Sequence, residues 1–452
     1  MISIQSIKTD VLIIGGSAAG IVAAQAGKSR YPDKEFLVVR KENHVLVPCA
    51  IPYLFKTLDS TRQNIIPDEA LKNAGIKLKI AEITSINRQN KTCKTADQTE
   101  ITYDKLIMAT GSTPIIPGWL KGANLENVYT IPKNKEYLDR FIQDLKNFKK
   151  ITIIGAGFIG VEISDEFTKA GKEVTLVEIM PDILSAAFDP EIAATAKNIL
   201  EKRGTKIKTG TGVKEIIGSK KVESVLSDSG EKQEADAVIL SMGYRPNTAL
   251  AKESGLKLTG TGFIKTDKHM RTTDPDIFAA GDCARKKNHF TRKDAPIMLA
   301  STATRESIIA AMNLYRPSAA NDGTIPVFST SIGETAFGAA GLIESFAKKE
   351  SIDIITGTFE GIDKHPGKLP NTSKQLVKLT ASTDGTILGA QVIGGPSTGE
   401  LTNLISFIIQ NKMTLDSLIT AQIGTHPLLT ASPIAYPLLK AAQLASKKIK
   451  KT

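Results

Sequence analysis

The sequence is short of cysteine and aromatic residues, and none of its apolar runs is long. Of its 452 residues, three are cysteines and 5% are aromatic. The cysteines are odd in number and far apart, and no Cys-x-x-Cys pair occurs, which argues against a disulfide framework or a metal site. No apolar stretch reaches the roughly 18 residues of a membrane span, and the N-terminus lacks a signal-peptide pattern. We therefore expect two to three domains in a reducing cytoplasm, with no membrane partner.

Basic residues outnumber acidic ones, but they are dispersed. Lys and Arg number 58 against 47 Asp and Glu, which gives a net charge of +11. Nucleic-acid binding calls for clustered cations, often with aromatic residues among them, and no such cluster occurs. The densest run, residues 447–451, is typical of a solvated tail. We expect no nucleic-acid partner; a basic surface that attracts anionic substrates is the alternative interpretation of the charge.

Residues 10–20 read as an apolar strand, a glycine-rich turn and the start of a helix. This is the opening of a dinucleotide-binding unit. Gly15 allows the tight turn, and Gly20 allows the helix to pack closely on the strand. Ser17 occupies the place of the usual middle glycine, and Arg40 replaces the acid expected at the end of the next strand. The fingerprint is therefore incomplete.

A lone cysteine, Cys49, follows that second strand in the sequence Val-Pro-Cys-Ala-Ile-Pro-Tyr. Prolines bound the segment, and an apolar, helix-like run follows. A thiol at a helix start is activated, because the partial positive charge there favours the thiolate. A small buried packing residue is the ordinary alternative for a free cysteine. In a doubly wound sheet this position is the carboxyl-end crevice, so the thiol would lie beside a bound dinucleotide.

Residues 151–178 repeat the opening with a complete Gly-x-Gly-x-x-Gly, formed by Gly155, Gly157 and Gly160. Glu178 ends the second strand, at the spacing expected of the acid that binds the adenosine ribose. A carboxylate there would repel a 2′-phosphate, so the sequence favours NADH over NADPH. Two dinucleotide sites imply two cofactors, and a flavin with a nicotinamide is the usual pair.

Two further segments have the character of cofactor contacts. Thr110 and Gly111 end an apolar strand in a tight turn. Gly281 and Asp282 end another, at an expected helix start where a carboxylate can bind a sugar hydroxyl while the helix faces a phosphate. Beyond residue 326 the pattern changes to alternating segments around an Asp384-Gly385 turn, followed by helices, which predicts an α+β domain.

These features, in this order, resemble the pyridine nucleotide–disulfide oxidoreductase family over nearly the whole chain. Dithiol members carry Cys-x-x-x-x-Cys, but Leu54 stands five residues after Cys49. Cys49-Ala-Ile-Pro-Tyr instead resembles the single-cysteine branch of coenzyme A-disulfide reductases, persulfide or polysulfide reductases, and NADH oxidases and peroxidases. The resemblance implies an α/β fold with two Rossmann-like dinucleotide-binding domains and a C-terminal α+β dimerisation domain. The expected segments are FAD-binding 1–113 and 245–325, NAD-binding 114–244 and dimerisation 326–452.

The resemblance also implies cofactors, site residues and a homodimer whose active sites are shared between subunits. The FAD positions are Gly15, Ser17, Gly20, Arg40, Thr110, Gly111, Gly281, Asp282 and Ala300, and the NAD positions are Gly155, Gly157, Gly160, Glu178 and Gly243. Cys49 is the redox-active residue. His426-Pro427 resembles the His-Pro by which dithiol members place a base in the partner's site, although the acid that orients that histidine is absent here.

We therefore predict an FAD-dependent NAD(P)H oxidoreductase that reduces a small disulfide, persulfide or polysulfide through Cys49. NADH is the favoured donor over NADPH. One alternative is an NADH oxidase or peroxidase in which Cys49 cycles through a sulfenic acid. Another is a redox-sensing or electron-transfer flavoprotein.

Overall fold

The structure is a computed structural model that describes residues 5–449, and it divides the chain into two compact units. Unit 1 comprises residues 1–119, 128–148 and 239–324, and unit 2 comprises residues 120–127, 149–238 and 325–452. Each unit is thus assembled from separate stretches of the chain. The predicted segment boundaries at residues 113, 244 and 325 remain predictions.

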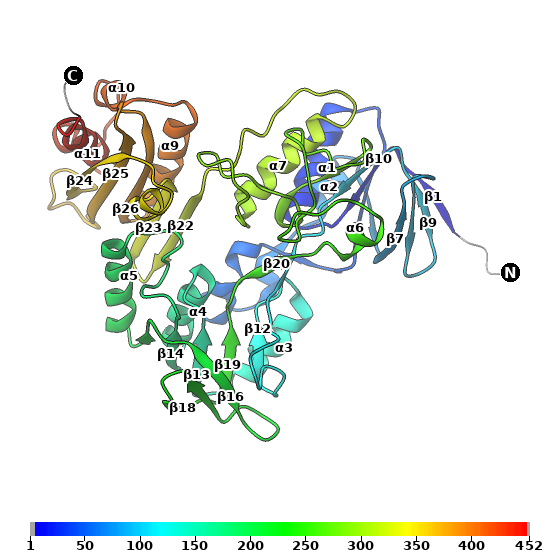
Figure 1. Ribbon diagram of the computed structural model, residues 1–452, viewed down its shortest axis with the longest axis horizontal. Coiled ribbons are helices and arrows are strands. Elements are labelled where there is room, and N and C mark those ends of the chain that lie inside the picture. Colours follow the sequence, from blue (N-terminus) through cyan, green and yellow to red (C-terminus); the bar gives the residue numbers. More distant parts are fainter. Residues whose placement is uncertain (1–4, 450–452) are drawn as a thin grey trace. The chain divides into compact units, whose positions relative to one another are not determined.

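Unit 1 is built on a five-stranded parallel sheet, the one that contains the labelled strand β10 in Figure 1. Its strand order is β21-β10-β2-β3-β6. Its strands are β2 (Val11–Ile14), β3 (Phe36–Arg40), β6 (Lys77–Ile80), β10 (Lys105–Met108) and β21 (Ile277–Ala279). Strand β2 is apolar throughout and β10 is apolar after Lys105, and these apolar side chains are buried on both faces, as a parallel sheet requires. Helices α1 (Ala18–Arg30) and α7 (Ala300–Met312) pack against each other. The strand order reverses at β2, so its carboxyl end is the crevice where ligands bind such sheets.

Smaller elements complete unit 1. A four-stranded sheet has the order β1-β9-β8-β7, and two strand pairs, β4–β5 and β11–β20, are antiparallel. The bounds are β1 (Ser6–Lys8), β4 (Val45–Leu46), β5 (Ile65–Ile66), β7 (Ile83–Asn87), β8 (Thr92–Thr95), β9 (Glu100–Thr102), β11 (Ser112–Pro114), β12 (Val128–Thr130), β20 (Tyr244–Pro246), α2 (Glu69–Asn73), α3 (Lys135–Leu145) and α6 (Ala249–Glu253). Four 3₁₀ turns are η1 (Pro48–Ala50), η2 (Pro52–Phe55), η3 (Thr61–Asn64) and η4 (Gly281–Cys283).

The first part of unit 2 repeats the strand–turn–helix plan. Parallel strands β13 (Lys150–Ile154), β14 (Glu173–Val177) and β15 (Lys206–Lys208) alternate along the chain with helices α4 (Phe158–Lys169) and α5 (Pro190–Lys202). An antiparallel sheet of β16 (Val213–Ile217), β17 (Ser224–Ser227) and β18 (Lys232–Glu234) follows. The chain then passes into unit 1 along β19 (Ala237–Leu240).

The second part of unit 2 is an antiparallel sheet with helices on it, the arrangement that the sequence predicts. The strand order is β22-β23-β26-β25-β24, from β22 (Val327–Ile332), β23 (Thr335–Gly341), β24 (Ile354–Ile362), β25 (Lys374–Ser382) and β26 (Ile387–Gly394). Gly385, with φ of 88°, lies in the predicted turn between β25 and β26. Helix α9 (Thr398–Gln410) packs on β23 and β26, and α11 (Pro437–Ser446) packs on β24 and β25. The remaining elements are α8 (Glu344–Lys349), α10 (Leu415–Ile419) and η5 (Pro433–Ala435).

No helix within residues 5–449 combines the length and the apolar character that crossing a membrane requires. Of the basic tail, Lys450 and Lys451 lie outside the described residues.

Candidate active site

The first glycine turn lies at the carboxyl end of β2, in the middle of the unit 1 sheet. Gly15 has φ of 108°, and a Cβ atom there would lie 2.1 Å from the carbonyl oxygen of Ala109. A Cβ atom at Gly20 would lie 1.8 Å from the carbonyl oxygen of Gly15. Both positions therefore demand glycine. Ser17 precedes α1 without capping it through its side chain, which leaves the first-turn amides of α1 available to an anion.

Arg40 supports this turn from behind. Its guanidinium donates to both carboxylate oxygens of Asp68, at 2.7 and 2.8 Å, and the residue is 3% exposed. It also donates to the carbonyl oxygens of Glu42 and Asn43, both at 2.9 Å. A Cβ atom on Gly16 would lie 2.5 Å from Cδ of Arg40, so the arginine stem fills the space beneath the turn. Its direct contact with FAD remains a prediction.

Thr110 and Gly111 follow β10 at the same edge of the sheet. The Thr110 hydroxyl donates to the carbonyl oxygen of Asn247 at 2.6 Å, and the amide of Asn247 donates to the carbonyl oxygen of Gly111 at 2.9 Å. Gly111 has φ of 70°, and the space around its missing side chain is open. The turn is thus tied to the Gly-x-Arg-Pro-Asn segment that contains Gly243. Gly243 belongs to unit 1, whereas the other predicted NAD residues belong to unit 2.

Gly281 and Asp282 follow β21, but the expected helix start is wrong. They form a three-residue 3₁₀ turn, because Ala284 adopts an extended conformation and bridges Ile264 in parallel. The Asp282 carboxylate accepts hydrogen bonds from Ser112 Oγ and Lys133 Nζ, both at 2.7 Å. The α-helix start beside this turn is therefore that of α1, and η4 positions the Asp282 carboxylate.

Lys133 and Ser112 set the charge state of Asp282. Burial raises the pKa of the Asp282 carboxyl, but the lysine and the serine more than offset this, so the pKa lies below its ordinary value. Lys133 also lies over the ring of Tyr244, 5.6 Å from its centroid. The sequence carried no signal for this group, because residues 112, 133 and 282 share no motif spacing.

Cys49 lies in η1, and the prediction of a regular helix after it is wrong. Pro52 has no N–H to donate to the carbonyl of Pro48, so an α-helical turn cannot form. The chain instead makes two 3₁₀ turns, in which Ile51 N donates to Pro48 O at 3.4 Å. The buried side chains of Ile51, Leu54 and Phe55 anchor them.

The thiol of Cys49 is exposed, whereas the other two cysteines are buried. Burial raises the pKa of the Cys93 thiol to about 12. Burial also raises the pKa of the Cys283 thiol, which lies 3.4 Å from the carbonyl oxygen of Ala280. Since the thiolate is the reactive form, Cys93 and Cys283 are packing residues. Cys49 is therefore the solvent-exposed cysteine of the three.

The second glycine turn, in unit 2, has the same construction. Gly155 has φ of 103°, and Gly157 precedes α4 with no side-chain cap and open space around it. The Glu178 carboxylate accepts hydrogen bonds from the amides of Ala156, at 2.6 Å, and Met180, at 2.8 Å. Gly160 is buried on α4. The structure therefore gathers these four predicted NAD residues, with the acid held against the turn.

Glu162, on α4, is a titratable group that the sequence reading missed. Burial raises the pKa of its carboxyl to about 7, although the Thr330 hydroxyl donates to it at 2.7 Å and favours the charged form. Perturbed carboxyls of this kind are common at functional sites. An acid two residues after Gly160 is visible in the sequence, but its burial is not.

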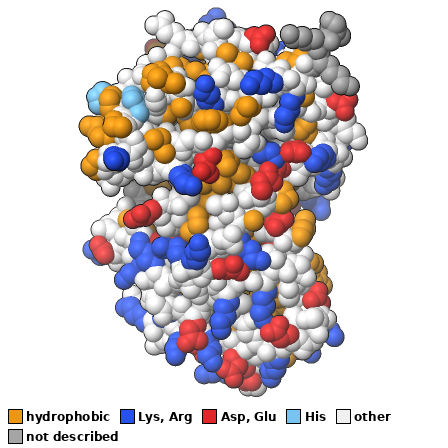
Figure 2. Space-filling view, turned by 90° about the vertical axis from the view of Figure 1, so that its left-hand side faces the viewer, with side chains coloured by type: hydrophobic (Ala, Val, Ile, Leu, Met, Phe, Trp, Pro, Cys, Tyr) orange, Lys and Arg blue, Asp and Glu red, His pale blue; other side chains and the backbone are white. Residues whose placement is uncertain are grey.

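His426 lies on an exposed loop of unit 2. Its Nδ1 accepts a hydrogen bond from the amide of Leu428 at 3.2 Å. Because an amide N–H only donates, the neutral imidazole carries its proton on Nε2. Leu428, Leu429 and Ile434 are exposed nearby in sequence, at 52%, 71% and 81%. Figure 2 shows histidine side chains beside hydrophobic ones on one face of the molecule.

An acidic cluster and a pocket in unit 2 stand apart from the predicted residues. Asp189, Glu191 and Glu344 converge as metal ligands would, but the ammonium of Lys378 lies among them, 2.8 Å from Asp189 and from Glu344. The Lys378 ammonium thus already occupies the place that a metal cation would take.

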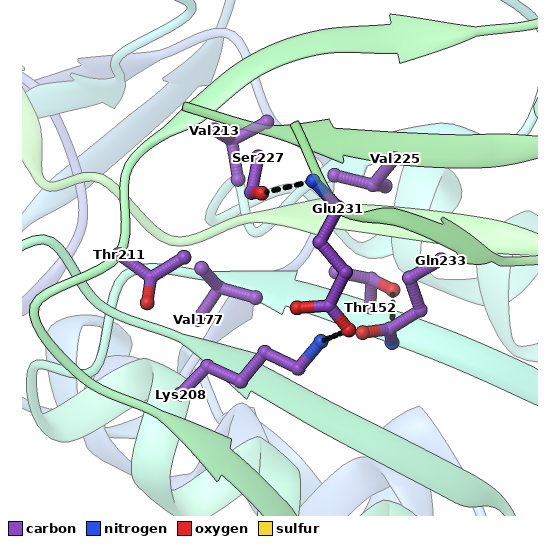
Figure 3. A pocket seen from close by; sticks show the side chains of 9 residues that line it. All are labelled: Thr152, Val177, Lys208, Thr211, Val213, Val225, Ser227, Glu231 and Gln233. Carbon is purple, nitrogen blue, oxygen red and sulfur yellow. Dashed lines mark hydrogen bonds and ion pairs between the residues drawn. The ribbon is translucent and has the colours of Figure 1, made fainter. Parts of the chain in front are cut away.

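The pocket in Figure 3, between the β13–β15 and β16–β18 strands, is crossed by a Lys208–Glu231 ion pair at 2.6 Å. No predicted cofactor residue lines it.

Comparisons with known proteins agree on one family. A model described as pyridine nucleotide-disulphide oxidoreductase matches residues 9–307, and the model of that family's dimerisation domain matches residues 327–434. An NADH oxidase of Methanocaldococcus jannaschii is 30% identical over 92% of this chain and 94% of that protein. An NAD(P)H coenzyme A polysulfide/persulfide reductase of Pyrococcus horikoshii is 28% identical over 92% of this chain and 94% of that protein.

A solved structure has the same architecture. The NAD-dependent persulfide reductase from A. fulgidus superposes with a TM-score of 0.88 at 28% identity, covering 97% of this chain and 83% of that one. These comparisons and the strand orders above confirm the predicted fold class, two dinucleotide-binding folds followed by an α+β domain.

Proposed function

Because the chain belongs to the pyridine nucleotide-disulphide oxidoreductase family, we propose that it is an FAD-dependent NAD(P)H oxidoreductase that reduces a small disulfide, persulfide or polysulfide through Cys49. The observation that carries this proposal is the contrast among the three thiols. Cys49 is exposed on an anchored turn of unit 1, and the other two are buried. Similarity to coenzyme A polysulfide/persulfide and persulfide reductases supports the sulfur acceptor.

The residues of unit 1 fit an FAD molecule. Gly15 and Gly20 leave no room for a Cβ atom and bring the uncapped start of α1 to the crevice, where amides can hold a pyrophosphate. Asp282, kept ionised by Lys133, can accept a sugar-alcohol hydroxyl. The proposed FAD residues at this edge also include Thr110, Gly111 and Gly281, with Ala300 at the start of α7. FAD supplies the transfer of two electrons from the nicotinamide hydride to a sulfur–sulfur bond.

Unit 2 would bind the nicotinamide cofactor. Gly155, Gly157 and Gly160 form the turn at the start of α4, and Glu178 would accept the adenosine ribose hydroxyls. The negative charge of Glu178 supports NADH as the better donor. Gly243 is proposed as a further contact from unit 1.

Cys49 would form the bond that is reduced. Its thiolate attacks one sulfur of the substrate R–S–S–R, forms Cys49–S–S–R and releases RS⁻. Two electrons, delivered as hydride from NADH, then cleave this bond and return the Cys49 thiolate with a second RS⁻. The balance is NADH, one proton and one disulfide giving NAD⁺ and two thiols. With a persulfide, the second product is hydrosulfide.

The match to a dimerisation domain supports a homodimer. We place His426 of a second copy at the Cys49 site, as the resemblance of its His-Pro segment implies. With Nδ1 held by Leu428, its Nε2–H would donate to the departing or resting thiolate. His426 would thus act as a hydrogen-bond donor rather than as an acid-oriented base.

The test is anaerobic NADH oxidation by the FAD-loaded protein with coenzyme A disulfide, coenzyme A persulfide, polysulfide or no acceptor. We expect turnover with at least one sulfur acceptor, and its loss in Cys49→Ser with FAD retained. Cys93→Ala, which removes a buried thiol of β8, is the matched control and should keep turnover. Undiminished turnover in Cys49→Ser would overturn the mechanism, and slow turnover with every acceptor would point to a redox-sensing or electron-transfer protein instead.

An NADH oxidase or peroxidase is the second candidate. The 30% identity to the M. jannaschii NADH oxidase favours it, and the same exposed Cys49 can cycle through a sulfenic acid. Rapid NADH consumption that requires air and needs no sulfur compound would establish this activity. Oxygen consumption measured beside the anaerobic assay separates the two candidates.

A further inference from the structure

Beneath the Gly281–Asp282 turn lies a buried ion pair, Lys286 and Glu306, whose side chains are both 0% exposed. Lys286 Nζ lies 3.4 Å from Glu306 Oε2. It also donates to the carbonyl oxygens of Gly281, at 2.6 Å, and Ala284, at 3.1 Å. Burying a charged side chain costs folding free energy unless the charge is paired and hydrogen-bonded. We therefore asked what this buried pair does beside the Gly281–Asp282 turn.

The pair holds Gly281 from both sides. Glu306 Oε2 accepts the Gly281 amide at 3.1 Å, while Lys286 binds the Gly281 carbonyl. The two peptide planes that flank Gly281 are therefore both fixed by side chains, and they set the direction of Asp282. Gly281 has φ of 77°, and a Cβ atom there would lie 3.0 Å from Cβ of Ala19, in the first turn of α1. We call Lys286 and Glu306 together the Gly281 clamp. The clamp thus lies next to the first-turn amides of α1.

One atom of the clamp is unused. Oε1 of Glu306 is buried and has no hydrogen-bond partner among residues 5–449. Burial raises the pKa of the Glu306 carboxyl to about 7, although Lys286, the Gly281 amide and Arg305 favour its charged form. From η4, Asp282 is the other charge close to Lys286. Strand β21 is apolar, Lys105 at the first position of β10 pairs with Asp276, and the nearest α1 residue, Ala19, presents no charge. Glu306 can therefore hold a proton on Oε1 near neutral pH.

We propose that Lys286 and Glu306 are positioning residues that fix Gly281 and Asp282 for FAD, and that Glu306 takes up a proton when FAD binds. The proposal rests on the FAD-binding part of the proposed function and is independent of the acceptor and of Cys49. The proton comes from solvent and resides on Glu306 Oε1. An anionic pyrophosphate held at the start of α1 disfavours a nearby carboxylate, so the Glu306 pKa is higher with FAD than without it. FAD binding consequently weakens as pH rises above about 7.

The test uses the full-length holoenzyme, diluted over a concentration series at pH 5.5 to 8.5, with FAD release followed by the recovery of flavin fluorescence. In the unsubstituted protein we expect the dissociation constant to rise on the order of tenfold between pH 6 and 8.5. Glu306→Gln keeps an oxygen for the Gly281 amide but cannot titrate, and its dissociation constant should lose this pH dependence. Ser307→Ala is the matched control: Ser307 is also buried on α7, but it donates to Ala303 within the helix and should behave as the unsubstituted protein.

Lys286→Met tests the clamp itself. Removing the ammonium leaves the Gly281 carbonyl without its donor, so FAD should dissociate at least about tenfold more readily at pH 6. The pH transition should also move upward, because the cation that lowered the Glu306 pKa is gone. An unsubstituted protein whose FAD affinity does not change with pH overturns the proposal without need of any variant. So does a Glu306→Gln protein that retains the full pH dependence.

Discussion

Lys133 Nζ lies 2.7 Å from Oδ2 of Asp282, and Ser112 Oγ contacts both groups, at 3.2 and 2.7 Å. Three residues that are far apart in the chain thus meet at the carboxylate proposed to bind the FAD sugar alcohol. The Asp282 side chain is 10% exposed and that of Lys133 is 31% exposed. The lysine therefore keeps a mostly buried acid ionised at the crevice.

Replacing Lys133 with Met should destabilise the protein and shift its acid sensitivity. At pH 7 we expect a loss of about 1.5–3 kcal/mol, the usual value of a hydrogen bond to a charged group. Because the Asp282 pKa is depressed in the folded state, its contribution to stability is present above its ordinary value of 3.8 and is lost as pH falls below it. In Lys133→Met the folded-state pKa of Asp282 rises, because burial is no longer offset by the ammonium, so less stability is lost on acidification and the stability profile flattens below about pH 4. Melting temperatures from pH 3 to 7 measure both effects.

The control for that variant is Lys135→Met. Lys135 pairs with Asp139 one helical turn on, at 2.6 Å, on α3. Such a pair contributes less than about 1 kcal/mol. Equal effects of the two substitutions on stability and on its pH dependence would contradict the role given to Lys133.

Glu178→Gln should move the coenzyme preference toward NADPH. The carboxylate that binds the Ala156 amide at 2.6 Å carries the charge that would repel a 2′-phosphate. We expect the ratio of kcat/KM for NADPH to that for NADH to rise at least about tenfold, which corresponds to about 1.4 kcal/mol. The ratio is informative because any general damage affects both coenzymes. Glu231→Gln, in the neighbouring ion pair with Lys208 (Figure 3), should leave the ratio unchanged.

Asp189→Asn should strongly destabilise unit 2. Asp189 accepts hydrogen bonds from Lys378 Nζ at 2.8 Å and Gln391 Nε2 at 2.5 Å, both from the C-terminal sheet. Removing one member of a buried charge pair costs about 3–5 kcal/mol. The control is Glu191→Gln: its side chain also contacts Lys378 but is 56% exposed, so it should cost less than about 1 kcal/mol. Denaturant unfolding measures both.

The hydrogen bonds of Asp189 also make the stability of the folded protein depend on pH in the acid range. Burial raises the Asp189 pKa, but Lys378, the Ser345 amide and Gln391 outweigh it, and the folded-state pKa is lowered. The stability from this group is therefore present above 3.8 and lost as pH falls below that value. Unfolding curves from pH 2.5 to 6 should show this loss in the unsubstituted protein and a flatter profile in Asp189→Asn. If Asp189→Asn has the same dependence of stability on pH as the unsubstituted protein, Asp189 is not the source of the acid sensitivity.

His426 should act through its Nε2–H. His426→Gln retains a side-chain N–H donor, whereas His426→Ala has none. We expect His426→Ala to lower kcat with a sulfur acceptor on the order of 10²-fold, and His426→Gln to lower it less. Both variants should retain FAD. His289→Gln, in unit 1, is the control. A glutamine variant as slow as the alanine variant would show that hydrogen-bond donation is not what His426 supplies.

Much of the fold can be predicted from the sequence because it depends on residues that are close along the chain. The turns at Gly15 and Gly155 need positive φ angles, which glycine adopts at low cost, so spacing alone revealed both dinucleotide-binding units. The apolar runs of β2 and β13 are buried on both faces, which is how parallel strands appear in a sequence. The Asp384-Gly385 sequence likewise predicts the turn between β25 and β26.

The sequence by itself therefore determined the order of the two glycine turns, the acid at Glu178 and the lone Cys49 segment, since each depends on residues that are close along the chain. Only the tertiary structure decided that Cys49 lies on 3₁₀ turns, that Lys133 neutralises Asp282, and that Lys286 and Glu306 clamp Gly281. Those relationships join residues up to 149 positions apart. No periodicity or spacing encodes such pairs, because burial and long-range packing bring them together only when the sheet closes around them.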